Sequence, residues 1–336
     1  MKQITLVTNA PSRSGLAYFH YLAFRDIYGK GVCIVDNGRS GYGRSLIERL
    51  ISRARIELRV DRKSQYRSLL KSIGDNPTNS VVIFYGMASL SACEIRELHS
   101  KGVSLYVYFS DSPFTLSAAN WGDIRKALPL FKCVFTPTND LVPVYFQNGA
   151  KRVVRIPFGY CRYTHLRSQP QVPGPDGNIY YFGTYSPMIE DWLDPLSKFP
   201  LIIHGHDWGK ALSRSLRLAA CRSIALDAFM AKAASGQLVV NFLRTNHGAC
   251  HSMKTFELPA AGACVLSNRT AEQLHFFPED SGVGYFDTKD EMLALLRKLL
   301  PNPDEIRRRI LLRGKWLSGQ TYHERVQGML NEICGC

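Results

Sequence analysis

Short apolar runs alternate with helix-length segments along most of the chain, and this alternation constrains the fold more than any other feature. In the first half, the runs with β-branched or aromatic residues span 4–8, 32–36, 81–85, 105–109, 133–136 and 153–156. Strands joined by helix-length connections form parallel sheets with helices on both faces. The sequence therefore predicts an α/β protein.

A Pro- and Gly-rich segment divides the alternation into two sets. Residues 167–178 read RSQPQVPGPDGN, a composition typical of a linker. The runs after this segment span 179–182, 201–204, 238–242, 264–267 and 283–286. We therefore expect two Rossmann-like domains over 1–165 and 179–320, joined by a linker over 166–178. Residues 321–336 are expected to end the last helix, at about 303–333, and to form a tail.

The composition is that of a globular protein without a membrane span. The chain has 336 residues, of which 45% are hydrophobic and 21% charged, and this size suits two domains. No apolar run approaches the ~20 residues that cross a bilayer, and the N-terminal MKQITLVTNA lacks the apolar core of a signal peptide. Nine scattered cysteines fit a reducing compartment. We therefore expect a cytoplasmic location.

The segment SMKTFELPAAG, residues 252–262, carries the most specific chemistry. Lys254 and Glu257 are three positions apart and share one face of the predicted helix. A cation near a helix N-terminus suits a diphosphate, and an ionised Glu accepts hydrogen bonds from paired ribose hydroxyls. The two residues therefore predict a grip on a nucleotide sugar. The alternative is an ordinary amphipathic helix with a surface Lys and Glu.

The flanking sequence resembles a known family. NFLRTNHGACHSMKTFELPAAGACVLSN, the later GYFDTKDEMLALLRKLL and the ending GKWLSGQTYHERVQGML resemble the C-terminal half of GT-B glycosyltransferases. The closest similarity is to the CgeB-like group within the group 1 type family. YYFGTYSP and PLIIHGHDW match the first strand-and-loop units of that domain, and YFSDSP and VFTPTNDLVPVYFQNGAKRVVRIPFG match the end of the N-terminal domain. At the end of the chain, Tyr322, His323 and Arg325 supply the family's terminal His and Arg.

The resemblance implies a fold and an activity. The fold is GT-B, with two Rossmann-like domains that face each other across a cleft, an N-terminal acceptor domain and a C-terminal donor domain. The last helix is expected to cross back to the N-terminal domain. The activity is transfer of a sugar from a nucleotide-sugar donor to a glycan or lipid-linked acceptor, as in bacterial surface polysaccharide or glycoconjugate synthesis. No metal and no cofactor are expected besides the nucleotide sugar as co-substrate.

Donor-binding residues are expected around the Lys254–Glu257 helix start. Lys254 stands where Arg is usual in the family and is the first candidate for neutralising the leaving diphosphate, with Arg244 second. Thr255 and Phe256 lie between the two charged residues and are counted with the donor site. A carboxylate eight positions before Glu257 would complete the motif of the retaining branch, but Ala249 stands there. The stereochemical outcome therefore stays open.

Two strand ends of the C-terminal domain are also expected at the donor site. The turn Gly183-Thr184-Tyr185 follows a strand and is expected to offer backbone N–H groups to phosphate, although Met188 and Ile189 stand where relatives often carry Arg or Lys. After the next strand, His204, Gly205 and Trp208 are expected to border the nucleobase, with an aromatic ring available to stack. The alternative for Trp208 is that it caps the core.

Histidines and a cysteine before the helix raise the question of a metal. His247, Cys250 and His251 are close in sequence, but paired Cys-x-x-Cys or His-x-x-x-His spacing with a second half elsewhere is absent. Zinc is the alternative, and the preferred interpretation is a polar loop with His247 or His251 facing the donor.

An acceptor base is expected from the N-terminal domain. Asp111, in FSDSP after a predicted strand, is the best placed carboxylate. The alternative is that Asp111 caps a helix before Pro113. Residues 8–15, TNAPSRSG, lack the Gly-x-Gly-x-x-Gly spacing, which disfavours an NAD-dependent oxidoreductase.

A net charge of +14 requires an anionic partner or a solvated basic face. The cluster from Arg49 to Arg67 suits an anionic membrane surface or a lipid-phosphate acceptor, with the protein peripheral at the inner face of the membrane. The alternatives are a nucleic-acid-binding protein or a glycosyltransferase that modifies DNA bases, for which charge is the only argument. A binding protein without transfer activity is the third hypothesis.

Overall fold

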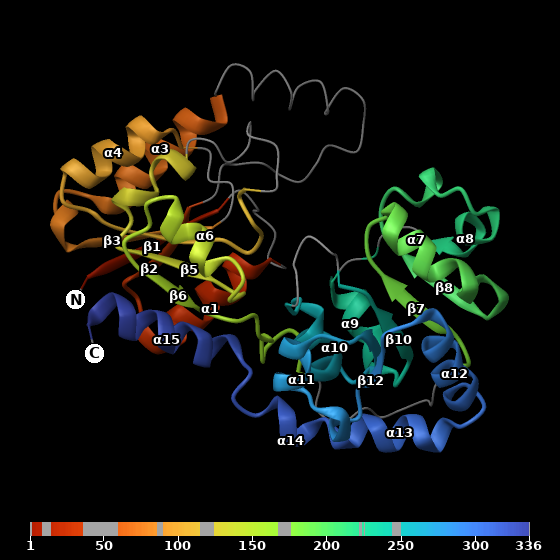
Figure 1. Ribbon diagram of the computed structural model, residues 1–336. Coiled ribbons are helices and arrows are strands. Elements are labelled where there is room, and N and C mark those ends of the chain that lie inside the picture. The colour runs from red at the N-terminus through yellow and green to blue at the C-terminus, as the bar shows by residue number, and fades with distance from the viewer. Residues whose placement is uncertain are drawn as a thin grey trace. The chain divides into compact units, whose positions relative to one another are not determined.

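The computed structural model describes residues 2–8, 15–35, 60–85, 90–114, 124–166, 176–221, 224, 226–243 and 250–335. The chain forms two compact units (Figure 1). Unit 1 contains Met1–Pro157 together with Tyr322–Cys336, and unit 2 contains Phe158–Thr321. None of the helices in these ranges is long and apolar enough to span a membrane.

Unit 1 is built on a parallel sheet of six strands in the order β2-β1-β3-β4-β5-β6. The strands are β1 (Gln3–Thr8), β2 (Val32–Val35), β3 (Ser80–Tyr85), β4 (Ser104–Tyr108), β5 (Cys133–Thr136) and β6 (Val153–Arg155). Every residue of β3 and β4 is buried, as expected for central strands covered on both faces. The predicted runs of the first half are therefore confirmed as strands.

Helices cover both faces of this sheet (Figure 1). Among the described residues, the helices of unit 1 are α1 (Leu16–Tyr28), α3 (Val60–Ile73), α4 (Ala92–Ser100), α6 (Val142–Gln147) and α15 (Tyr322–Cys334), with short 3-10 turns at Pro77–Asn79 and Leu128–Leu130. Phe84 and Val107 pack with Leu98 of α4 in one core cluster. Helix α4 begins at a capping box, in which Ser91 accepts from the Glu94 amide and the Glu94 carboxylate accepts from the Ser91 amide.

The last helix packs onto the first helix of unit 1. Tyr322 of α15 is fully buried and stacks on Phe19 of α1, with ring centroids 5.6 Å apart. His323 Nε2 lies 2.7 Å from Asp26 Oδ2. His20 is held between Tyr322 and Tyr85, and burial lowers its pKa to about 3. Helix α15 is thus part of the core of unit 1.

Unit 2 has a second parallel sheet, in the order β12-β11-β10-β7-β8-β9. The strands are β7 (Ile179–Phe182), β8 (Leu201–His204), β9 (Ala220–Cys221), β10 (Leu238–Asn241), β11 (Cys264–Asn268) and β12 (Gly284–Phe286). The five predicted runs are confirmed, and the two-residue β9 was missed because it is too short to show a pattern. The order of strands reverses between β7 and β10, and such a point is where α/β sheets bind ligands.

The helices of unit 2 pack on the two faces of its sheet. They are α7 (Pro187–Leu193), α8 (Arg214–Ala219), α9 (Leu226–Ala234), α10 (Lys254–Ala261), α11 (Ala271–Phe276), α12 (Lys289–Leu299), α13 (Pro303–Leu312) and α14 (Gly314–Leu317), with 3-10 turns at Asp194–Lys198, Trp208–Lys210 and Glu279–Ser281. Tyr181 and Ile203 share a core cluster with Leu193 of α7 and Met292 of α12. The opposite face holds Phe182, which contacts Phe229 of α9 at 4.4 Å between ring centroids.

Two details differ from the sequence-based expectation. The helix expected over 303–333 is three helices, α13, α14 and α15, and Gly319 adopts a φ of +75° in the break before α15. The units divide at residue 158 rather than after 165. The reason is that Phe158 donates its amide to His251 and Tyr160 donates its amide to Gln320, both within unit 2. Most of the expected linker lies outside the described residues.

Candidate functional site

Lys254 lies at the carboxyl end of β7, beside the point where the order of the sheet reverses. Its ammonium donates to the carbonyl oxygen of Phe182, the last residue of β7, and lies 5.8 Å from the centroid of the Tyr181 ring. Lys254 is the first residue of α10, and the seven residues after it are all buried. The Lys254 ammonium is therefore held at the carboxyl end of β7 by a helix whose packing leaves it little freedom to shift.

Glu257 follows Lys254 by one turn and is almost completely buried, with 6% of its surface exposed. Burial raises its pKa to about 7, although the nearby Lys254 acts in the opposite direction. Glu257 Oε1 lies 3.6 Å from Nε2 of His165, which belongs to the segment that follows β6. A carboxyl group with this pKa can be either charged or protonated near neutral pH.

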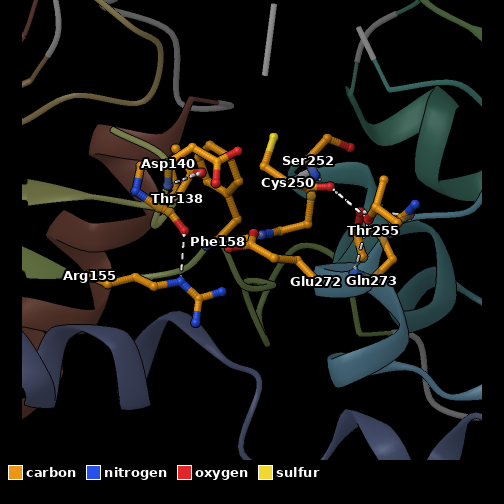
Figure 2. A network of polar contacts seen from close by, with 12 residues as sticks. Thr138, Asp140, Arg155, Phe158, Cys250, Ser252, Thr255, Glu272 and Gln273 are labelled. Carbon is orange, nitrogen blue, oxygen red and sulfur yellow. Dashed lines mark hydrogen bonds and ion pairs between the residues drawn. The ribbon is translucent and has the colours of Figure 1, made fainter. Parts of the chain in front are cut away.

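Thr255 and Phe256 anchor α10 instead of facing a donor, which corrects their assignment. Thr255 Oγ1 accepts from the Ser252 amide and contacts Gln273 Oε1 of α11 at 3.3 Å (Figure 2). Phe256 is fully buried, and its ring meets that of Phe276 edge-on at 5.0 Å. Both side chains point into the core because the face opposite Lys254 and Glu257 packs against α11.

His251 is also structural, which corrects the expectation that it faces the donor. Its Nε2 accepts from the Phe158 amide at 3.0 Å, and its Nδ1 lies 2.6 Å from Glu272 Oε2; Figure 2 labels the partners Phe158 and Glu272. Both ring nitrogens are therefore engaged by protein groups. In the described part of the chain, no three His, Cys, Asp or Glu side chains gather as metal ligands.

The loops after β7 and β8 pack tightly against each other. The Gly183 amide donates to the His204 carbonyl, and the Tyr185 amide donates to the His206 carbonyl. The amides of Gly183 and Tyr185 are therefore not available to phosphate, which corrects the role expected for these two residues. Thr184 is partly buried in the same loop, and its role at the donor site stays a prediction.

Trp208 is a core residue, in agreement with the alternative that it caps the core. It is buried, and its indole N–H donates to the Gly183 carbonyl at 2.8 Å. The rings of Tyr181 and Tyr185 meet it edge-on at 5.9 and 5.5 Å. The indole N–H and the ring are therefore engaged within unit 2, and the indole holds the two loops together. This corrects the expectation that Trp208 stacks on a nucleobase.

Two further polar side chains at this edge are occupied as well. His204 is buried and stacks on Phe182, with ring centroids 5.6 Å apart. The Tyr185 hydroxyl donates to Glu190, which also accepts from the Ser213 amide at 2.7 Å. Burial would raise the pKa of Glu190, but these hydrogen bonds lower it below the usual value. Glu190 therefore stays ionised and fixes the start of α8.

Asp111 lies in unit 1, three residues after the end of β4. It is partly buried and accepts from the Ser110 hydroxyl at 3.2 Å. Within the described residues no helix begins at Asp111 or Pro113, because a turn follows in which Ser112 Oγ accepts from the Phe114 amide. The role of Asp111 as base stays a prediction.

Arg244, His247 and Arg49–Arg59 lie outside the described residues.

Sequence reasoning missed His165 and Glu190. His165 is 92 positions before Glu257, so no spacing motif connects the two. Glu190 stands near the place where a basic phosphate ligand was expected after the β7 turn. The Ser186-Pro187 helix start before Glu190 was the available signal, because an acid in the first turn suits a helix N-terminus.

Comparison with known proteins identifies the fold. A family model described as glycosyl transferase-like matches residues 186–331. No curated protein matches the chain. Among solved structures, the chain is similar to sucrose-phosphate synthase (tll1590) from Thermosynechococcus elongatus, with a TM-score of 0.67 and 11% identity over 99% of this chain and 98% of that one.

Two further structures agree. Anabaena Alr3699/HepE in complex with UDP-glucose gives a TM-score of 0.65 and 10% identity over 99% of this chain and all of that one (100%). TarM gives 0.58 and 11% identity over 80% of this chain, but the match spans 57% of TarM. The predicted GT-B fold and the resemblance to GT-B glycosyltransferases are confirmed, and none of these matches supports the nucleic-acid alternative.

Substitution of Gly205 tests the packing of the two loops. A Cβ on Gly205 would lie 1.8 Å from the Gly183 carbonyl oxygen, whereas a Cβ on Gly209 would meet no atom within 4 Å. We expect Gly205→Ala to lower the free energy of unfolding by about 3 kcal/mol and Gly209→Ala to change it by less than about 1 kcal/mol. Chemical denaturation measures both, and equal stabilities would contradict the close contact.

The raised pKa of Glu257 predicts a dependence of stability on pH. Its pKa is about 7 in the folded protein against an ordinary value of 4.5, so the folded state binds the proton more tightly. The resulting stabilisation is complete below the unfolded pKa and is lost as pH rises to about 7. Relative to Glu257→Gln, the unliganded wild type should lose up to about 3 kcal/mol between pH 4.5 and 7.5. Denaturation curves across this range measure the difference, with Glu279→Gln on the surface as control. Parallel curves for wild type and Glu257→Gln would refute the assignment.

Proposed function

We propose that this chain, whose second unit is glycosyl transferase-like and whose fold is GT-B, transfers a sugar from a nucleotide-sugar donor to a glycan or lipid-linked acceptor. The observation that supports the donor site most directly is the placement of Lys254 and Glu257. Both lie on one turn of a buried helix, and Lys254 reaches the carboxyl end of β7, where the order of strands reverses between β7 and β10. A cation and a carboxyl group at such an edge are complementary to a diphosphate and a ribose.

Lys254 is proposed to stabilise the leaving diphosphate. Negative charge grows on the bridging oxygen as the bond to the sugar breaks, and a cation fixed beforehand lowers the energy of that state. The ammonium contacts the Phe182 carbonyl and lies over the Tyr181 ring, and a diphosphate at this strand end would add an anionic partner. Because Lys254 supplies this positive charge, we propose that transfer is independent of a metal ion.

Glu257 is proposed to accept hydrogen bonds from the ribose hydroxyls. Its ionised form is the better acceptor, and a pKa of about 7 means that ligand binding and ionisation favour each other. The structure of Anabaena HepE was determined with UDP and with UDP-glucose, so a uridine nucleotide is the first donor to test. The sugar itself is a hexose in this proposal.

The acceptor is proposed to be a glycan or lipid-linked molecule of a surface polysaccharide or glycoconjugate, and Asp111 is proposed to accept its proton. The surface formed by Lys210, Leu212, Arg214, Arg217 and Leu218, which we call the α8 surface, supports a peripheral membrane location. Leu212 and Leu218 are 87% and 77% exposed, next to three basic residues. Exposed leucines with basic neighbours suit an anionic bilayer surface.

Substitution of Lys254 tests the proposed function. Wild type should be stabilised in a thermal shift assay by one of UDP, GDP, CDP, ADP and dTDP. Lys254→Ala should then lower turnover by about a hundredfold, with a smaller loss in diphosphate affinity and no change in nucleoside affinity. Lys232, whose ammonium lies 5.4 Å from the Tyr180 ring, provides a matched control away from the strand end. An equal loss for nucleoside and diphosphate would show that Lys254 is structural.

The α8 surface predicts binding to vesicles. The protein should co-sediment with anionic but not neutral vesicles, and salt should release it because surface charges are screened within about 10 Å at ~0.1 M. Leu212→Ser with Leu218→Ser should reduce binding at least about fivefold. Leu311→Ser is the control, since Leu311 is 73% exposed but lies on α13, outside the α8 surface. Binding to DNA in place of vesicles would contradict the membrane proposal.

A further inference from the structure

His165 is fixed by its own turn. The segment after β6 folds so that the Cys161 amide donates to His165 Nδ1 at 2.9 Å, while the His165 amide donates to the Cys161 carbonyl at 2.8 Å. The side chain is completely buried. The backbone hydrogen bond fixes the turn, and the hydrogen bond to Nδ1 together with burial restricts the orientation of the ring within unit 2.

The same contacts assign the proton of the imidazole. A backbone amide can only donate, so Nδ1 must be an unprotonated acceptor, and the proton of the neutral ring is then on Nε2. Nε2 lies 3.6 Å from Glu257 Oε1. This distance is longer than a hydrogen bond but gives a favourable electrostatic contact between an N–H dipole and a buried carboxylate.

The carboxyl group of Glu257 is thus approached by two groups from different parts of the chain. Lys254 acts on it from its own helix, and His165 acts from the segment after β6. His251, on the segment that leads into α10, is instead engaged by Phe158 and Glu272. Of the two histidines, His165 is therefore the one whose Nε2 faces Oε1 of Glu257.

We propose that His165 is a positioning residue for the donor, which holds Oε1 of Glu257 so that the other oxygen receives the ribose hydroxyls. The inference rests on the proposed nucleotide-sugar function and adds His165, which does not itself contact the donor in that proposal. A carboxylate that rotates freely loses part of the benefit of each hydrogen bond, because ordering it on binding costs entropy. With His165 in place, the rotation is restricted before the donor arrives.

The proposal predicts how the ribose hydroxyls contribute to affinity. In wild type, UDP should bind at least about tenfold more tightly than its 2′-deoxy or 3′-deoxy analogue, because a charge-assisted hydrogen bond is lost. In His165→Phe this ratio should fall to that of Glu257→Gln, within about threefold. His165→Gln, which offers an amide N–H near the position of Nε2, should restore part of the ratio. If His165 had only a structural role, its substitution would lower the affinity for UDP and for both deoxy analogues by the same factor.

Isothermal titration calorimetry with UDP and its two deoxy analogues tests this prediction. If another nucleoside diphosphate stabilises wild type most, that diphosphate and its deoxy analogues are used instead. His275→Phe, an exposed histidine on α11, is the matched control and should keep the wild-type ratio. A wild-type ratio in folded His165→Phe would overturn the role of His165 alone. Failure of wild type to bind any nucleoside diphosphate would overturn the proposed function and this inference with it.

Nitrogen NMR on wild type with labelled histidine gives a second measurement, in case His165→Phe does not fold. The His165 signals should report a neutral ring protonated on Nε2, and the Nε2 signal should shift when UDP is added but less with the deoxy analogues. A ring protonated on Nδ1, or an Nε2 signal that does not respond to UDP, would contradict the proposal.

Discussion

The burial of every residue of helix α10 after Lys254 is the constraint on which the candidate site depends. Residues 255–261 are all buried, and the helix ends at Gly262 with a φ of +111° that leads directly into β11. A helix without an exposed face cannot rotate or slide without losing apolar contacts worth several kcal/mol. The positions of Lys254 and Glu257 therefore follow from the packing of the hydrophobic residues around them.

This burial also explains the chemistry of the two charged residues. A carboxyl group taken out of water favours its protonated form, and Lys254 compensates only in part, so the pKa of Glu257 rises to about 7. Lys254 avoids the same cost because its amine reaches the Phe182 carbonyl at the strand end. The helix thus places the Lys254 ammonium at its partly exposed start and the titratable Glu257 carboxyl one turn further in, where it is buried. Two neighbouring residues on the surface would not differ in burial in this way.

The sequence predicted the fold better than the site. Strands such as β3 and β4 are continuous apolar runs, and burial on both faces of a parallel sheet produces this pattern directly. That Lys254 and Glu257 share one turn of a helix could be predicted because their relation is local, while their role at the donor site stays a prediction. His165 could not be predicted, because its contact with Glu257 is made by the tertiary fold. Trp208 and Phe256 show the opposite error, since an aromatic side chain that could stack on a ligand is equally suited to a core, and the sequence does not show which face of the loop or helix it occupies.

The occupied amides after β7 and β8 change how the donor can be recognised. In Rossmann sheets a Gly-rich turn exposes backbone N–H groups to phosphate. Here Gly183 and Gly205 serve a different purpose, because they allow the two loops to approach so closely that the Gly183 amide and the Trp208 indole both bond within the unit. Among the described residues at this end of the sheet, our proposal therefore relies on side chains to hold the donor, with charge from Lys254 and hydrogen bonding from Glu257. Side chains can be repositioned by their neighbours, and His165 Nε2 lies 3.6 Å from Glu257 Oε1, so in our proposal His165 affects donor binding through the carboxylate.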